Sequence, residues 1–263
     1  MDYDPLRRGI AEFIGTFALI FVGAGSILAL TTLFEPVINN AQALGVYNGL
    51  TLVAVAFAHG LVIAVMVSAV GHISGGHFNP AVTLAFVVTR RIAGMLAVVY
   101  WSMQFLGATL AAALLRWFFS DNVRQLTNLG APGLGGGIDV WQGLVIEAIL
   151  TFFLVWVIFA TAVDPGGTFK SVAGLAIGLT ITLDIFMGGP LTGAAMNPAR
   201  AFGPELVSRH WADAWVWYAG PVIGAVIAGI AYDWLYLRPP RPLPVGPPES
   251  GVIEPRPGDT AVS

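Results

Sequence analysis

The most informative features of this 263-residue chain are what it lacks: cysteine, and most of the usual charge. The absence of cysteine rules out disulfides and thiol chemistry, and it leaves the redox compartment open. Asp, Glu, Lys and Arg make up only 10% of the residues, whereas a soluble domain averages about 25%. A net charge of −3 gives no sign of a nucleic-acid partner. Because no nucleophile–base pair or metal-ligand cluster is present, we expect no enzyme, no metal and no cofactor.

Apolar residues fill the chain instead, at 56% of the sequence. The mean hydropathy is +0.78. A bilayer span needs about 20 apolar residues, and six segments qualify: Gly9–Leu33, Gly49–Val70, Ile92–Phe119, Val140–Val163, Ser171–Met187 and Ala214–Leu237. The 32 glycines suit close helix packing in a bilayer. We therefore expect an all-α integral membrane protein with six transmembrane helices.

One tripeptide occurs twice, as Asn79-Pro80-Ala81 and as Asn197-Pro198-Ala199. Asn is favoured at a helix N-cap and Pro at the first helical position, so each copy predicts a helix start. The two helices, Pro80 to about Thr89 and Pro198 to about Val207, are too short to cross a bilayer and are typical of re-entrant pieces.

The segments before the two tripeptides, His72–Phe78 and Gly188–Met196, are expected to be irregular backbone. Irregular backbone at membrane depth persists only where it is packed in protein or lines a wet cavity. A water-filled path beside the two helix starts is therefore expected.

The chain also repeats itself. Glu12 and Glu147 open similar stretches in the first and fourth spans, and each half, about 9–119 and 140–237, holds three spans and one short helix. Because three is odd, the second half must enter the membrane from the opposite face, which makes an inverted repeat. Such repeats place the functional site near the midplane, at broken helices.

The paired carboxylates Glu12 and Glu147 have two interpretations. Ionisable groups inside a membrane are functional by default, which suggests a proton or ion site. Alternatively, each buried carboxylate accepts hydrogen bonds from the exposed N–H groups of a nearby broken loop. We favour the structural role, because symmetric duplication suits a scaffold better than a single transport site.

Basic residues indicate the orientation. One side of a six-span arrangement would hold Arg7, Arg8, Arg90, Arg91, Lys170, Arg238, Arg241 and Arg256, and the other only Arg116, Arg124 and Arg209. Cytoplasmic loops carry the excess of Lys and Arg, so both termini are expected in the cytoplasm. We expect residues 1–8 to form a short N-terminus, 9–237 the channel domain and 238–263 a disordered, Pro-rich tail. We expect the membrane to be the plasma membrane.

At these residues the chain resembles the aquaporins, or major intrinsic proteins. The resemblance extends over about Gly9–Leu237, and it rests on His72–Thr83 and Thr192–Pro204, each with an Asn-Pro-Ala, and on the Arg that follows the second copy. It implies one pore per subunit and a homotetramer. The family's narrowest point maps onto His59, Ile185, Ala194 and Arg200, a set similar to that of plant tonoplast intrinsic proteins.

The resemblance also assigns roles within the pore. Asn79 and Asn197 would cap their helices through the side-chain oxygen and turn the amide NH₂ to passing water. A ladder of acceptors would come from the backbone carbonyls of Gly75, Gly76, His77, Phe78, Gly193, Ala194, Ala195 and Met196.

We therefore predict a passive channel for water that excludes protons and ions and also passes urea, ammonia or hydrogen peroxide, with glycerol slower. Its partners would be these solutes and the lipid bilayer. A glycerol or polyol facilitator is the alternative, and an ion-coupled secondary transporter is less favoured.

Overall fold

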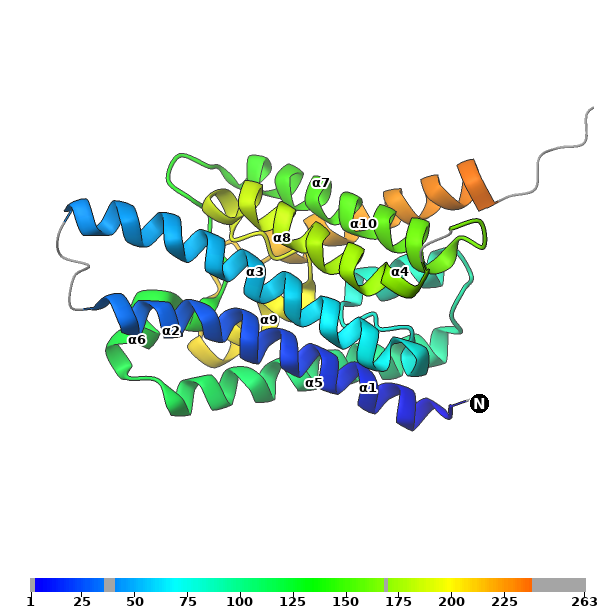
Figure 1. Cartoon of the computed structure of the whole chain (residues 1–263), viewed down its shortest axis with the longest axis horizontal. Helices are drawn as coiled ribbons and strands as arrows, with labels where there is room; N and C mark the ends of the chain where they lie inside the picture. Colours follow the sequence, from blue (N-terminus) through cyan, green and yellow to red (C-terminus); the bar gives the residue numbers. More distant parts are fainter. Residues whose placement is uncertain (1–2, 36–40, 168–169, 238–263) are drawn as a thin grey trace, which may run out of the picture.

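A computed structural model describes residues 3–35, 41–167 and 170–237 of the chain (Figure 1). Within these residues six helices are long and apolar enough to cross a membrane, and none of the residues lies in a β-strand, which confirms the all-α prediction. The predicted tail 238–263 lies outside the described residues. The elements of the first half are α1 (Pro5–Ala18), η1 (Leu19–Ala24), α2 (Gly25–Phe34), α3 (Ala41–Ser74), α4 (Pro80–Val88) and α5 (Gly94–Phe118).

The second half repeats this order after a connection that holds two short elements, α6 (Asp121–Thr127) and η3 (Asn128–Gly130). Its elements are α7 (Val140–Ile158), η4 (Phe159–Val163), η5 (Lys170–Val172), α8 (Ala173–Thr192), α9 (Pro198–Ser208), α10 (Val216–Tyr232) and η6 (Asp233–Leu237). The first helix begins at Pro5 rather than Gly9, because Asp4 caps it by accepting from the Arg7 N–H at 2.9 Å.

The fifth span was predicted too short. It continues to Thr192 rather than ending at Met187, and α3 likewise continues to Ser74, so the irregular backbone is confined to 75–79 and 193–197. Gly188, Gly189 and Pro190, expected to be irregular backbone, lie within α8. Gly188 instead serves packing, since a Cβ there would lie 2.4 Å from Leu150 Cδ1 on α7. Gly193 N–H closes the helix on the Gly189 carbonyl at 3.0 Å.

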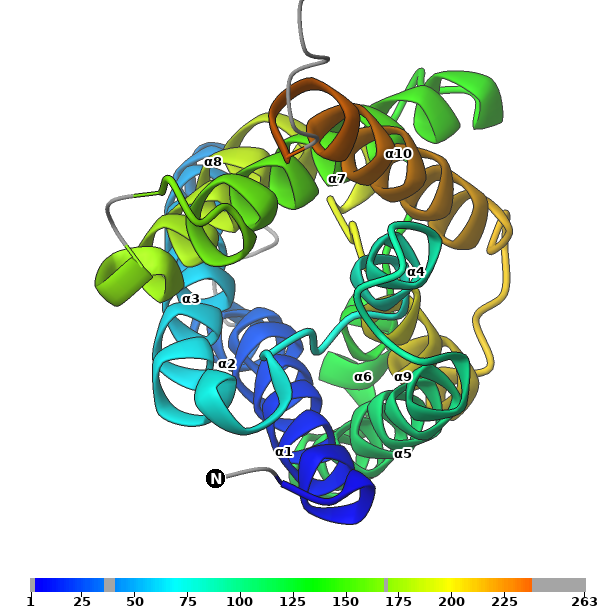
Figure 2. The same ribbon diagram turned by 90° about the vertical axis from the view of Figure 1, so that its right-hand side faces the viewer.

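The helices form a ring when the bundle is viewed from its end (Figure 2). Contacts within the first half have counterparts in the second: α1 packs on α5 as α7 packs on α10, and α1 packs on α3 as α7 packs on α8. Each short helix packs against the last long helix of the other half, α4 on α10 and α9 on α5. The two halves run in opposite directions, with α1 and α7 starting at opposite ends of the molecule (Figure 1).

Glycine permits the closest helix crossings. At the crossing of α3 and α8, a Cβ on Gly60 would lie 2.4 Å from the Gly178 carbonyl oxygen, and a Cβ on Gly178 would lie 2.2 Å from that of Gly60. Gly107 and Gly224 repeat this relation between α5 and α1 and between α10 and α7. The backbones approach as closely as small residues allow in membrane bundles.

We predict that Gly178→Ala lowers the thermal unfolding midpoint in detergent, because the added methyl must push α3 from α8 at a cost of about 1–3 kcal/mol. Gly49→Ala is the matched control, since a Cβ at Gly49 of α3 meets nothing within 4 Å. An unchanged midpoint for Gly178→Ala would contradict this account of the crossing.

Candidate functional site

The starts of α4 and α9 meet in the middle of the ring. Asn79 Oδ1 accepts from the N–H groups of Ala81 and Val82 at 2.9 and 3.4 Å. Asn197 Oδ1 accepts from Ala199 and Arg200 in the same way, at 3.0 and 3.3 Å. Both asparagines therefore cap their helices, and the short helices α4 and α9 point their partly positive N-terminal ends at the same region.

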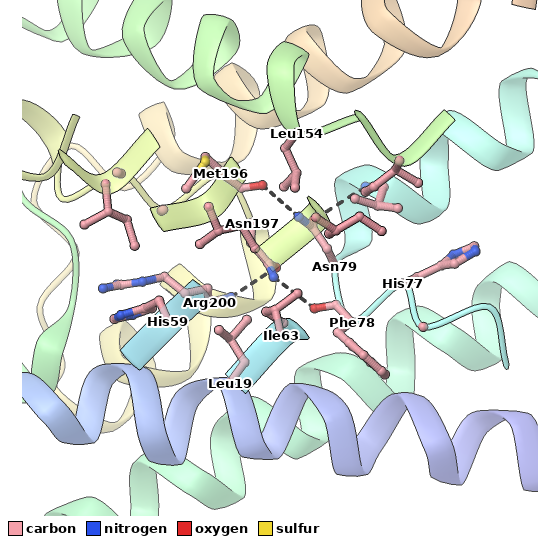
Figure 3. A pocket seen from close by; sticks show the side chains of 18 residues that line it. Leu19, His59, Ile63, His77, Phe78, Asn79, Leu154, Met196, Asn197 and Arg200 are labelled. Carbon is pink, nitrogen blue, oxygen red and sulfur yellow. Dashed lines mark hydrogen bonds between the residues drawn. The ribbon is translucent and has the colours of Figure 1, made fainter. Parts of the chain in front are cut away.

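Each asparagine also bonds across to the other half (Figure 3). Asn79 Nδ2 donates to the Met196 carbonyl at 2.8 Å, and Asn197 Nδ2 donates to the Phe78 carbonyl at 2.9 Å. One hydrogen of each amide is thus used to join the two loops. Since an amide carries two N–H hydrogens, one remains on each asparagine without a partner among the described residues.

The loops before the asparagines adopt an unusual backbone. Phe78 and Met196 have φ of 47° and 51°, and Ala194 has φ of 44°. This left-handed region costs a residue other than glycine about 1–3 kcal/mol, so the surroundings must hold it in place. Glycine occupies three further left-handed positions, Gly75, Gly76 and Gly193.

Glu147 holds the second loop from α7. Its Oε1 accepts from the Thr192 hydroxyl at 2.7 Å and from the Ala195 N–H at 2.9 Å, and its Oε2 accepts from the Met196 N–H at 2.7 Å. The side chain is fully buried. Three donors thus converge on one carboxyl group, which holds in place a loop whose backbone is strained.

Glu12 holds the first loop from α1 through equivalent contacts. Oε1 accepts from the Ser74 hydroxyl at 2.6 Å and from the His77 N–H at 3.0 Å, and Oε2 accepts from the Phe78 N–H at 2.6 Å. Gln104 on α5 adds a fourth donor at 2.8 Å. Both glutamates predicted to be structural thus contact the loops that precede the asparagines.

Three cavities follow one another through the ring. The central one, about 40 Å³, is lined by residues 76–79 of the first loop and 194–197 of the second, with His59, Ile185 and Arg200 at one end and His77 at the other. Cavities of about 290 Å³ and 680 Å³ lie beyond these ends. A water molecule needs at least about 10–15 Å³ of such volume, so the central cavity has room for water.

The wall of the central cavity is largely apolar. Leu19, Ile63 and Leu154 come from three different helices and face the two asparagines (Figure 3). His77 lines both the central cavity and the smaller outer one, which we call the terminal mouth because Tyr3 and Arg8 near the chain start line it. The larger outer cavity is called the far mouth.

All four residues of the predicted narrow point line the central cavity. His59, Ile185 and Arg200 also line the far mouth, so they lie where the two cavities meet. The His59 side chain is held by a 2.9 Å contact between Nδ1 and the Val55 carbonyl, and its Nε2 is buried without a partner in the described chain. Ala194 is buried and lies beside Gly188.

Arg200 is buried with only 4% of its surface exposed. One terminal nitrogen donates to the Gly130 carbonyl at 2.8 Å, and its Nε has no partner among the described residues. Figure 3 shows Arg200 and His59 side by side at one end of the cavity. A buried cation and an imidazole therefore line the same passage, and each keeps one buried nitrogen without a partner among the described residues.

The predicted carbonyl ladder divides among the cavities. Residues 76–78 and 194–196 line the central one, whereas Gly75 lines the terminal mouth and Gly193 the far mouth. The Phe78 and Met196 carbonyls each already accept one hydrogen bond from an asparagine. A carbonyl oxygen has two lone pairs, so each keeps one for water.

Sequence reasoning missed the part played by the connection between the halves. Gly130 has φ of 75°, and a Cβ there would lie 2.9 Å from the Ala24 Cβ. A Cβ on Gly135 would lie 2.2 Å from the Pro190 carbonyl oxygen. The signal was the cluster of glycines Gly130, Gly133, Gly135, Gly136 and Gly137, which lets this loop reach Arg200.

Two aromatic side chains that support the loops were also missed. The Tyr100 hydroxyl donates to the Ser74 carbonyl at 2.5 Å, and Trp217 Nε1 donates to the Thr192 carbonyl at 2.9 Å. The two carbonyls end α3 and α8, so the aromatic donors satisfy helix ends at matching places in the repeat. Glu205 pairs with the Tyr218 hydroxyl at 2.7 Å.

Comparisons with known proteins agree on one family. The model of the family described as "Major intrinsic protein" matches residues 2–232. "Probable aquaporin TIP3-2" of Arabidopsis thaliana is 42% identical over 235 residues, which is 89% of this chain and 85% of that protein. "Aquaporin TIP4-4" of Zea mays is 42% identical over 238 residues, covering 90% and 89%. The structure of an aquaglyceroporin from Plasmodium falciparum superposes with a TM-score of 0.72 at 22% identity, over 88% of this chain and 97% of that one, and so shares the fold.

We predict that Glu147→Gln lowers both the thermal midpoint and the permeability. The amide NH₂ would face at least one of the three donors, and a buried donor left unpaired costs about 1–3 kcal/mol. Glu205→Gln is the control, because Glu205 Oε1 has no partner in the described chain and its place can take the NH₂. If the two variants lose thermal stability and permeability to the same extent, the contacts of Glu147 with the loop do not determine these properties.

Proposed function

The chain belongs to the major intrinsic protein family, and we propose that it is a passive channel that conducts water and excludes protons and other ions. The membership makes it a multi-pass membrane channel; the choice of what passes is the proposal. One observation carries it: two asparagine-capped helix starts line the same cavity, which has room for water.

The asparagines supply the mechanism. A water between them can accept from the spare N–H of Asn79 and from that of Asn197. Its oxygen then points at the asparagines, and both of its hydrogens point away along the path, to carbonyls on either side. A water held so cannot accept a hydrogen bond from its neighbours, which interrupts the chain that proton transfer requires. The positive ends of α4 and α9 add a barrier to any cation.

The absence of carboxylates from the passage argues against ion coupling. None of the described residues that line the central cavity is Asp or Glu, and the charged group among them is Arg200. Glu12 and Glu147 are occupied by loop donors. An ion-coupled transporter would need an acceptor that changes its protonation or binds a cation.

The narrow point favours slim neutral solutes in addition to water. Ile185 gives one wall no polar group, and Ala194 contributes only a methyl beside Arg200. His59 and Arg200 line the same junction and give it polar side chains that can bond a solute that has lost part of its hydration. Urea, ammonia and hydrogen peroxide fit this chemistry, and glycerol would pass more slowly because of its length.

Assembly and orientation complete the proposal. Family membership supports a homotetramer with one pore per subunit. The terminal mouth, lined by Arg8 and Arg91, would face the cytoplasm by the excess of basic residues on that side. The expected plasma-membrane location draws no support from the relatives, which are TIP-type proteins.

We predict that proteoliposomes containing the protein shrink several-fold faster than empty vesicles in stopped-flow light scattering after an osmotic step. A pH gradient across the same vesicles should decay no faster than in empty ones. Water flux at the empty-vesicle rate, or a proton leak that rises with protein content, would refute the channel proposal.

We further predict that the parent passes urea or hydrogen peroxide measurably and that His59→Phe combined with Ile185→His removes this flux while water permeability persists. The two changes narrow the passage and restore a polar group to its wall. Solute uptake into the same vesicles provides the measurement. If the solute flux persists in the double variant, His59 and Ile185 do not form the narrow point.

A further inference from the structure

We propose that Gly23, on the first helix, is a specificity-determining residue of the channel: its missing side chain makes the space that the His59 ring occupies and thereby sets the width of the narrow point. The inference rests on the proposed function and deepens it. Gly23 does not line the central cavity, and its effect passes through His59.

The contact between the two residues is close. A Cβ on Gly23 would lie 2.5 Å from His59 Cδ2, 2.6 Å from Nε2 and 3.0 Å from Cε1. Three of the five ring atoms of His59 therefore lie too close to the position that the Cβ of any other residue at 23 would take. Gly23 is buried within η1, a π-helical turn of the kind found often at functional sites.

The His59 ring cannot yield in the direction of its own helix. Nδ1 is tied to the Val55 carbonyl one turn earlier on α3, and the side chain is 3% exposed. The open space beside the ring is the junction of the central cavity and the far mouth, where Arg200 also lies (Figure 3). A methyl at position 23 would therefore push the imidazole into the passage.

If the backbone of the helix that carries Gly23 shifts away from His59 instead, the shift also affects the narrow point. Ala24, the next residue, is fully buried, and it abuts Gly130, where a Cβ would already lie 2.9 Å from the Ala24 Cβ. The Gly130 carbonyl holds Arg200. Whether the ring or the backbone gives way, the displacement reaches one of the two polar side chains at the narrow point.

Gly25 provides a matched control, because it is also buried and lies two residues further along the same helix. A Cβ there would meet Leu115 Cδ2 on α5 at 3.1 Å, and neither Gly25 nor Leu115 lines the central cavity or either mouth. Both substitutions add one methyl to the same packed region, but only the methyl at position 23 meets a side chain that lines the passage.

The test compares Gly23→Ala, Gly25→Ala, His59→Ala and the double variant Gly23→Ala with His59→Ala in proteoliposomes. We expect Gly23→Ala to lower urea permeability about tenfold, the effect of about 1.4 kcal/mol of added barrier, and to lower water permeability far less. Gly25→Ala should leave the ratio of the two permeabilities unchanged. In the His59→Ala background the Gly23 substitution should have no effect, since the ring it would displace is gone.

Thermal unfolding of the same four proteins in detergent gives a second readout that needs no transport. The Gly23→Ala change should lower the midpoint when His59 is present and leave it unaltered when His59 is Ala. If Gly23→Ala alone does not fold, recovery of a folded protein in the double variant supports the contact. An unchanged permeability ratio in Gly23→Ala, or an equal effect in both backgrounds, overturns the proposal, as does a double variant that also fails to fold. A parent that conducts no water would instead refute the proposed channel and leave the unfolding comparison to decide the role of Gly23.

Discussion

Two buried carboxylates hold the loops on which the rest of the path depends. Phe78 and Met196 sit in left-handed backbone, and the N–H group of each donates to a glutamate, Glu12 or Glu147. Strained residues in a region without water need strong local acceptors, because each unpaired N–H would add its own cost. With the loops held, Asn79 and Asn197 are placed to cap their helices and to bond across to the opposite loop.

The repeated halves supply a scaffold, and the departures from the repeat supply the chemistry. Glu12 and Glu147 make matching contacts, as do Tyr100 and Trp217. The position that corresponds to Arg200 in the first copy of the motif is Val82, which has no charge to offer. The Gly130 carbonyl that holds Arg200 comes from the connection between the halves, which the repeat does not contain. The two halves therefore line the path with matching contacts, whereas Arg200 and the Gly130 carbonyl that holds it occur at only one end.

The unpartnered atoms at that end are consistent with a wet passage. A buried polar group without a hydrogen bond costs about 1–3 kcal/mol, and His59 Nε2 and Arg200 Nε both lack protein partners in the described chain. Both side chains line a cavity that has room for water, although the two nitrogens are themselves buried. Gly23 and Gly130 act at the same place in opposite ways: one leaves room for the imidazole, and the other brings a carbonyl to the guanidinium.

The sequence by itself determined the number of spans, the two helix starts and the order of the repeat, because hydropathy, caps and motif spacing are local properties. It also predicted which residues cap the short helices, since Asn directly before Pro is a local signal for the start of a helix. Only the tertiary structure decided that Gly188 packs rather than breaks its helix, that a glycine-rich connection reaches Arg200, and that Gly23 faces His59. These are contacts between segments distant in the chain. The sequence alone does not show whether a glycine allows an unusual backbone conformation or leaves space for a neighbouring side chain. The position of the neighbouring segment in the folded protein distinguishes these two roles.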